Sequence, residues 1–203
     1  MPQTIDKSAT SRIYGHGRGW AFSTNDLADL GARPAIDSTL RRLTEKGTIR
    51  RITRGLYDYP QFSQLLNQEL SPDIDQVAQA IARKFGWRIQ ASGVLAENLL
   101  GLSTQVPAKA VYLSDGPNRT YRIGKRTLTF KHTALKEVGF KFRESELIVQ
   151  ALKSIGPDQI TPETISRIRA WLPEHLRTKL LADTKTATGW VRAAIQRVAK
   201  EEA

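Results

Sequence analysis

Residues 34–59 constrain the fold of this chain more than any other stretch. Apolar residues recur at helical spacing after a first-turn proline: Pro34, Ile36, Leu40 and Leu43. Gly47 ends this run, and two short β-branched or aromatic runs follow at 48–53 and 56–59, on either side of Gly55. The pattern predicts an amphipathic helix followed directly by a β-hairpin.

Two further helices are expected upstream of this helix. Ser23 and Thr24 provide an N-cap and Gly31 a stop for a short helix, and an earlier helix is expected over 5–14. Three helices and a hairpin in this order are typical of a winged helix-turn-helix. Trp20 and Phe22 then belong to the core at the edge of the hairpin sheet, behind a glycine-rich turn.

Basic side chains are concentrated on the third helix and the hairpin. Residues 33–54 carry seven basic against two acidic side chains in a chain of net charge +11, which suits a polyanionic partner. Guanidinium groups can pair with phosphates and read guanine edges, and hydroxyl groups add short donors. The candidate DNA-binding residues are Arg33, Ser38, Thr39, Arg41, Arg42, Arg50, Arg51, Thr53 and Arg54. The competing interpretation is a solvated basic helix, or a winged helix that binds protein.

The chain is expected to divide near the prolines at 60 and 72. We predict a winged helix-turn-helix domain at 1–60, a linker at 61–74 and a mixed α/β domain at 75–203 that ends in a small helical bundle. The fold class is therefore α+β. The linker is polar but contains an isolated apolar pair, Leu65-Leu66.

The second domain is expected to contain a basic hairpin. A helix is predicted from residue 75 to Gly86 and another at 94–100, and alternating runs predict strands at 110–113, 120–123 and 128–132. Helices are expected at 146–155, 162–171, 173–182 and 188–200. A second basic patch is expected on the hairpin, at Arg122, Lys125, Arg126 and Lys131. A merely solubilising edge is the alternative.

The sequence carries no recognisable catalytic motif. Cysteine is absent, so thiol nucleophiles and cysteine-based metal sites are excluded, and no His-x-x-x-His or Gly-x-Ser-x-Gly spacing occurs. We expect no enzyme activity, no metal and no cofactor. No apolar run is long enough to span a membrane and the N-terminus lacks an apolar core, so a cytoplasmic protein is expected.

Three stretches resemble the AbiEi-type antitoxins of bacterial toxin-antitoxin and abortive-infection loci. Residues 40–57 carry Leu-x-x-Leu, Gly-x-Ile and Arg-Gly-Leu-Tyr elements similar to the end of that family's N-terminal winged helix. Residues 91–107 and 111–117 are similar to the start of its second domain. The resemblance covers about residues 10–145.

The resemblance implies a two-domain antitoxin that represses its own operon. Its winged helix would bind double-stranded DNA at the operator, and its C-terminal region would counter a nucleotidyltransferase-like toxin. The DNA-binding role would fall on Ser38, Thr39, Arg41 and Arg42 of the third helix and on Arg51 and Arg54 of the hairpin. The alternatives are a protein-interaction module and a solitary repressor with no toxin. No heptad pattern specifies an oligomeric state.

Overall fold

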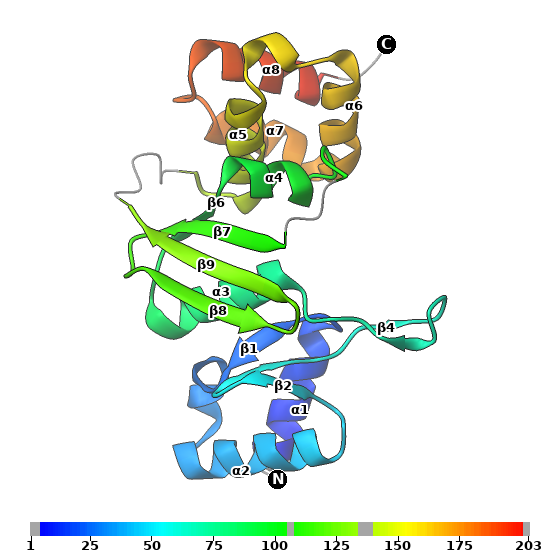
Figure 1. The fold of residues 1–203 in the computed structure, drawn as a ribbon, viewed down its shortest axis with the longest axis vertical. Helices are drawn as coiled ribbons and strands as arrows, with labels where there is room; N and C mark the ends of the chain where they lie inside the picture. The colour runs from blue at the N-terminus through cyan, green and yellow to red at the C-terminus, as the bar shows by residue number, and fades with distance from the viewer. Residues whose placement is uncertain (1–4, 105–107, 134–139, 201–203) are drawn as a thin grey trace. The chain divides into compact units, whose positions relative to one another are not determined.

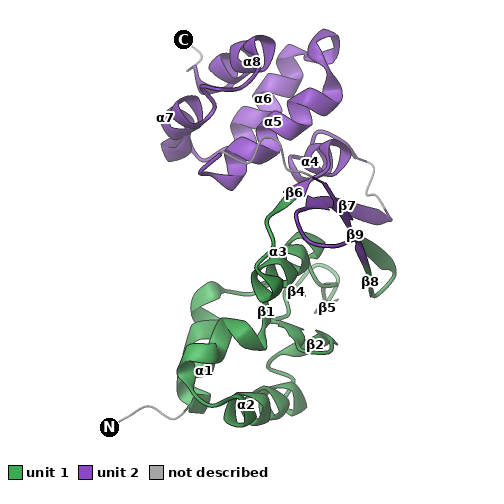
Figure 2. Ribbon diagram, turned by 90° about the vertical axis from the view of Figure 1, so that its left-hand side faces the viewer, with its two compact units in different colours: residues 1–89, 120–128 green, residues 90–119, 129–203 purple. Residues whose placement is uncertain are grey.

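The computed structural model describes residues 5–104, 108–133 and 140–200. They divide into two compact units, which Figure 2 draws in green and purple. The first unit comprises residues 1–89 and 120–128, and the second comprises residues 90–119 and 129–203. Helices and strands are both well represented, and the fold class is α+β.

The first unit has the element order of a winged helix. Six elements, blue to cyan in Figure 1, follow one another: α1 (Ile5–His16), β1 (Ala21–Ser23), the 3₁₀ helix η1 (Thr24–Leu30), α2 (Arg33–Glu45), β2 (Arg50–Thr53) and β3 (Leu56–Asp58). Both neighbours of β3 run antiparallel to it, in the sheet order β1-β3-β2. The predicted helices and hairpin are therefore confirmed, except that the second helix is 3₁₀ rather than α.

Local sequence explains where these elements begin and turn. Ser23 and Asp26 form a capping box at the start of η1. The Ser23 hydroxyl accepts from the backbone N–H of Asp26, and the Asp26 carboxylate accepts from the backbone N–H of Ser23. Gly55, at φ 68°, occupies the left-handed region at the tip of the β2–β3 hairpin, which we call the wing.

One apolar cluster holds the winged helix together. The apolar face of α2 packs against residues from α1, from η1 and from β1, and against the residues just before β1 and β2. The buried members are Ala9, Ile13, Trp20, Phe22, Leu27, Ile36, Leu40, Leu43 and Ile49. Trp20 and Phe22 lie in this core with stacked rings, 4.7 Å between centroids, as the sequence predicts.

The helix α3 (Ile74–Phe85) belongs to the first unit. Arg83 donates to the carboxylate of Asp26 at 2.7 Å and to the backbone oxygen of Ala21 at 2.9 Å. The sequence division assigned this helix to the second domain, whereas the compact unit that contains the winged helix extends to Ile89. Independent folding of residues 1–60 stays a prediction.

The segment predicted as a linker contains a β-hairpin. Strands β4 (Phe62–Ser63) and β5 (Gln68–Glu69) pair antiparallel, with Phe62 opposite Glu69 and Ser63 opposite Gln68. Pro60, before the hairpin, is buried, while the residues from 64 to 69 are exposed.

A four-stranded sheet follows in the chain. Its order is β6-β7-β9-β8, and its strands are β6 (Ile89–Ala91), β7 (Lys109–Ser114), β8 (Arg119–Ile123) and β9 (Arg126–His132). The alternating runs thus form the strands that their pattern predicts. Residues 105–107 and 134–139 lie outside the described ranges.

The second unit is helical in its C-terminal part. Its helices are α4 (Gly93–Leu99), α5 (Arg143–Ile155), η2 (Pro157–Gln159), α6 (Pro162–Trp171), α7 (Glu174–Asp183) and α8 (Gly189–Ala199). α4 packs on α5, and α8 packs on both α6 and α7. The predicted helical C-terminal part is therefore present.

The contact between α4 and α5 is closest at Gly93. A Cβ atom on Gly93 would overlap the Cβ of Ser154 and would lie 3.2 Å from the backbone oxygen of Gln150. Ser92 occupies the N-cap position of α4 without a side-chain capping bond, so the glycine rather than the serine governs this helix start.

We expect Gly93→Ala to destabilise the protein by about 1–3 kcal/mol, because two helices must separate to admit one methyl group. Gly189→Ala is the matched control, since a Cβ there meets nothing within 4 Å. Urea denaturation of both variants measures the difference. Equal midpoints for the two variants would contradict the close approach of α4 and α5.

Candidate nucleic-acid interface

A hollow of about 450 Å³ lies between α2 and the wing. Four arginines line it together with two acidic residues and an aromatic ring. The lining residues are Arg33, Asp37, Arg41, Thr44, Glu45, Arg51, Arg54, Gly55 and Tyr57. We call this hollow the basic groove.

The α2 side of the groove is one stripe of the helix. Positions 33, 37, 41 and 45 follow at intervals of four and are all exposed, so they form one solvent-facing stripe. Arg33 pairs with Asp37 at 3.0 Å, and Arg41 approaches Glu45 at 3.9 Å. Such exposed pairs contribute about 0.3–0.5 kcal/mol, so a phosphate can displace the carboxylates from either arginine.

The wing supplies the other side of the groove. Arg51 and Thr53 are exposed on β2, and Arg54 is exposed in the turn before Gly55. The pairing of β2 with β3 shifts register between Arg51 and Thr53. Burial still alternates along β2, so Arg51 and Thr53 are exposed while Arg50 and Ile52 are partly buried.

Positive charge accumulates where α3 approaches the wing. The ammonium group of Lys84 lies 3.5 Å from the backbone oxygen of Arg54. Burial, and then the charges of Arg33 and Arg54, lowers the pKa of Lys84. Lys84 therefore adds a third positive charge beside Arg33 and Arg54, which favours an anionic partner.

Three of the candidate DNA-binding residues lie near the contact between α2 and α1, and two of them, Thr39 and Arg42, connect the two helices. The buried Thr39 hydroxyl donates to the carboxylate of Asp6, and Arg42 donates to the same carboxylate at 2.6 Å and to Ser38 at 3.1 Å. The hydrogen bonds from Arg42 and Thr39 lower the pKa of Asp6. Thr39, Arg42 and Ser38 therefore lie beside the α1–α2 contact and not among the residues that line the basic groove.

Arg50 differs from its neighbour Arg51. Its guanidinium donates to both oxygens of Asp58, at 3.1 and 2.6 Å, and it lies 3.6 Å from Glu69. Asp58 is only 2% exposed. Burial raises the pKa of Asp58, and the bonds from Arg50 oppose that rise. Arg50 therefore neutralises a buried carboxylate within the sheet.

The residues of the predicted second patch lie on the β8–β9 hairpin. Arg122 is exposed on β8, Lys125 is exposed in the turn, Arg126 is half-buried at the start of β9, and Lys131 is exposed near its end. The role of this second basic patch as a polyanion contact stays a prediction.

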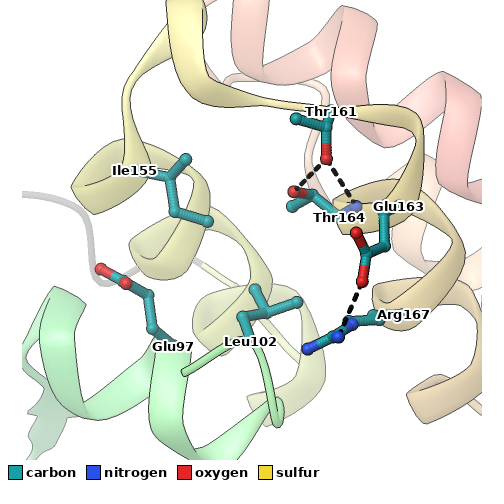
Figure 3. A pocket seen from close by; sticks show the side chains of 7 residues that line it. All are labelled: Glu97, Leu102, Ile155, Thr161, Glu163, Thr164 and Arg167. Carbon is teal, nitrogen blue, oxygen red and sulfur yellow. Dashed lines mark hydrogen bonds and ion pairs between the residues drawn. The ribbon is translucent and has the colours of Figure 1, made fainter. Parts of the chain in front are cut away.

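A polar pocket of about 270 Å³ lies among the helices of the second unit (Figure 3). Its polar groups bond mainly to each other. Thr161 caps α6 by accepting from the backbone of Thr164 at 3.2 Å, and Arg167 pairs with Glu163 at 2.7 Å. Figure 3 shows Glu97 pointing away from these groups. The arrangement stabilises the start of α6.

The described ranges contain neither a candidate metal site nor a candidate membrane span. No group of three or more histidine, aspartate or glutamate side chains within them is placed to hold a metal ion. None of the helices described has both the length and the apolar character needed to cross a membrane.

The fold and the basic groove define a winged-helix protein of the α+β class. Residues 9–180 match a family described as a family of unknown function, DUF6088, and the chain belongs to that family. No curated protein matches the sequence.

Sequence reasoning missed part of the groove. The spacing of Asp37 and Glu45 from Arg33 and Arg41 could have indicated that they share its stripe. The proximity of Lys84 to Arg54 could not be predicted, because the helix that carries Lys84 was assigned to the other domain. Tyr57 was known as a strand residue, but no pattern places its ring beside the arginines.

The two adjacent arginines provide a test of these roles. We expect Arg50→Ala to destabilise the protein by about 2–3 kcal/mol at pH 7, because it leaves the buried carboxylate of Asp58 without its cation. Arg51→Ala should change stability by less than about 0.5 kcal/mol, since its side chain is exposed. Urea denaturation at pH 7 and pH 5 checks both.

The pH dependence has a definite sign. A carboxyl whose pKa is raised in the folded state favours folding at low pH and loses that contribution as the pH rises through its folded pKa. Removing Arg50 raises the pKa of Asp58 further, so the deficit of Arg50→Ala should shrink between pH 7 and pH 5. A deficit that is equal at both pH values would contradict the pairing.

Proposed function

We propose that this chain is a DNA-binding transcriptional regulator that binds duplex DNA through the basic groove. The supporting observation is a winged-helix frame on which Arg33 and Arg41 of α2 face Arg51 and Arg54 of the wing. An exposed α2 stripe suits the major groove, and a basic wing suits the adjacent phosphates.

The charge around the groove favours a polyanion over a small acidic ligand. Burial and the charges of Arg33 and Arg54 lower the pKa of Lys84, and the acid that pairs with Arg33 is exposed, in contrast to the buried Asp58 that pairs with Arg50. A duplex presents phosphates in a regular row, and each neutralised phosphate releases counterions. Six of the nine residues that line the groove are charged, whereas small-molecule sites are lined mainly by hydrophobic and aromatic side chains.

Two acidic residues in the groove favour a sequence-selective contact. Asp37 and Glu45 repel phosphates, which lowers affinity for any duplex, but carboxylates accept hydrogen bonds from the cytosine amino group. Alternation of Arg33, Asp37, Arg41 and Glu45 along one stripe therefore suits the reading of base edges better than a uniformly basic helix would.

The finer proposal is an antitoxin that represses its own operon in the cytoplasm and counters a nucleotidyltransferase-like toxin. Its support is the resemblance of residues 40–57, 91–107 and 111–117 to AbiEi-type antitoxins. In this proposal the winged helix binds the operator and the C-terminal part acts on the toxin.

The DNA proposal is tested by mobility-shift titration on the region upstream of the chain's own gene and on a scrambled duplex, over a range of salt concentrations. We expect selective binding. Arg41→Ala should lose about 1–3 kcal/mol on the selected site, and Arg54→Ala should weaken all duplexes and reduce the salt slope by about 1.

Arg192→Ala is the control, because Arg192 is an exposed arginine of α8 and its loss removes the same charge. It should bind as the unchanged chain does. If it reduces the salt slope as much as Arg54→Ala does, net charge and not the groove accounts for binding. Equal, weak binding to both duplexes would favour the protein-interaction module.

The antitoxin proposal is tested by co-expression with the adjacent gene. We expect that gene alone to arrest growth and this chain to restore it. Arg54→Ala should relieve repression of the operon and still restore growth, since the wing contacts DNA and not the toxin. If the adjacent gene does not arrest growth and the chain still binds its operator, the chain is a solitary repressor and the antitoxin proposal fails.

A further inference from the structure

The β4–β5 hairpin presents leucines to solvent. Leu65 at its tip is 94% exposed, Leu66 is 58% exposed and Phe62 on β4 is 48% exposed. Figure 1 shows the hairpin, near the label β4, projecting away from the winged helix of its own unit. We call residues 61–70 the arm.

The arm is held in this projecting conformation by specific contacts. At the tip, the backbone N–H of Leu66 donates to the Ser63 hydroxyl at 3.2 Å, and Asn67 adopts a left-handed φ of 47°. At the base, the N–H of Leu70 donates to the backbone oxygen of Gln61 at 2.7 Å. Glu69 also lies 3.6 Å from Arg50. The leucines therefore stay on the tip rather than folding onto the core.

The chemistry of the arm suits a second copy of itself. Residues 61–68 carry no charge in a chain that is 25% charged. In a two-fold contact each side chain meets its own counterpart, so a charge would meet a like charge. Leucines pack on leucines, and the amides of Gln64, Asn67 and Gln68 both donate and accept. The arm is self-complementary in a way that the strongly basic surfaces of this chain are not.

The small area of the tip indicates under which condition two arms can bind each other. Burying a leucine removes roughly 100 Å² from water, so two leucines from each copy bury about 400 Å². Stable protein interfaces bury about 1,200 Å² or more. The contact is too small to hold a dimer in solution, but it can couple two copies already held near one another, at an effective concentration of about 1 mM.

We propose that two copies bound at neighbouring sites on one DNA molecule contact each other through the leucine tips of their arms, an inference that rests on the proposed function. The contact makes the binding of the second copy cooperative with that of the first. It acts through the arm alone and leaves the basic groove of each copy to bind DNA.

The absence of cysteine from the chain provides a direct test. Leu65→Cys places one thiol on the tip, and Val94→Cys places one on α4, where Val94 is 64% exposed. Both purified full-length variants are oxidised with and without the duplex from upstream of the chain's own gene. Covalent dimer is measured by non-reducing electrophoresis, and DNA binding by mobility shift of the same samples.

We expect the Leu65→Cys dimer to increase at least about tenfold with the duplex, and the Val94→Cys dimer to stay low. A duplex that shifts while both variants give equal yields of dimer would overturn the arm contact and leave the regulator proposal standing. A duplex that does not shift at all would overturn the regulator proposal, and the arm contact with it.

A second variant measures the energetic consequence. Leu65→Ser combined with Leu66→Ser removes the apolar tip without touching the core, and Val94→Ser is its control. The two-copy complex of the double variant should need about tenfold more protein, while its one-copy complex forms at an unchanged concentration. If the double variant affects both complexes equally, or affects neither, the inference is overturned. It is also overturned if Leu65→Cys cross-links to the adjacent gene's purified product instead of to a second copy.

Discussion

Burial of the apolar face of α2 determines which of its charges reach solvent. Ile36 and Leu40 are at most 2% exposed, and burying each contributes about 1.5–3 kcal/mol. The ion pairs on the opposite face contribute about 0.3–0.5 kcal/mol each. The core therefore fixes the rotation of the helix about its axis, and this rotation leaves Arg33 and Arg41 exposed on the stripe that faces the wing. The basic groove is a consequence of packing.

The same packing separates arginines that look alike in the sequence. Arg50 and Arg51 are adjacent, yet strand alternation directs them to opposite sides of the wing sheet. Arg50 meets Asp58, whose burial makes a cation necessary, whereas Arg51 meets solvent. Local sequence shows the alternation but not the depth of Asp58, because that depth depends on the pairing of β1 with β3 and on the packing of α3 against both strands. A basic cluster in a sequence therefore overstates the charge available to a ligand.

Sequence patterns predicted the winged helix because its elements follow strong local rules: a first-turn proline at Pro34, apolar spacing at Ile36, Leu40 and Leu43, and a glycine turn at Gly55. They did not predict the arm, because glutamine, serine and asparagine have weak strand preference and the arm strands are held by pairing and by contacts at their base. They also could not place Lys84 beside Arg54 of the wing, since its position depends on the long-range bonds from Arg83 to Asp26 and Ala21. What is local was predictable, and what depends on a distant partner was not.

The net charge of the chain makes the contact between arms depend on DNA binding by the groove. A chain of net charge +11 repels its own copies in solution, so an uncharged tip with two leucines gains too little to hold them together. Phosphates neutralise much of that charge when the groove is occupied, and the repulsion between copies falls. The same small apolar contact then becomes favourable without any change in the arm. Self-association is in this way conditional on DNA because of electrostatics alone, and no conformational switch is required.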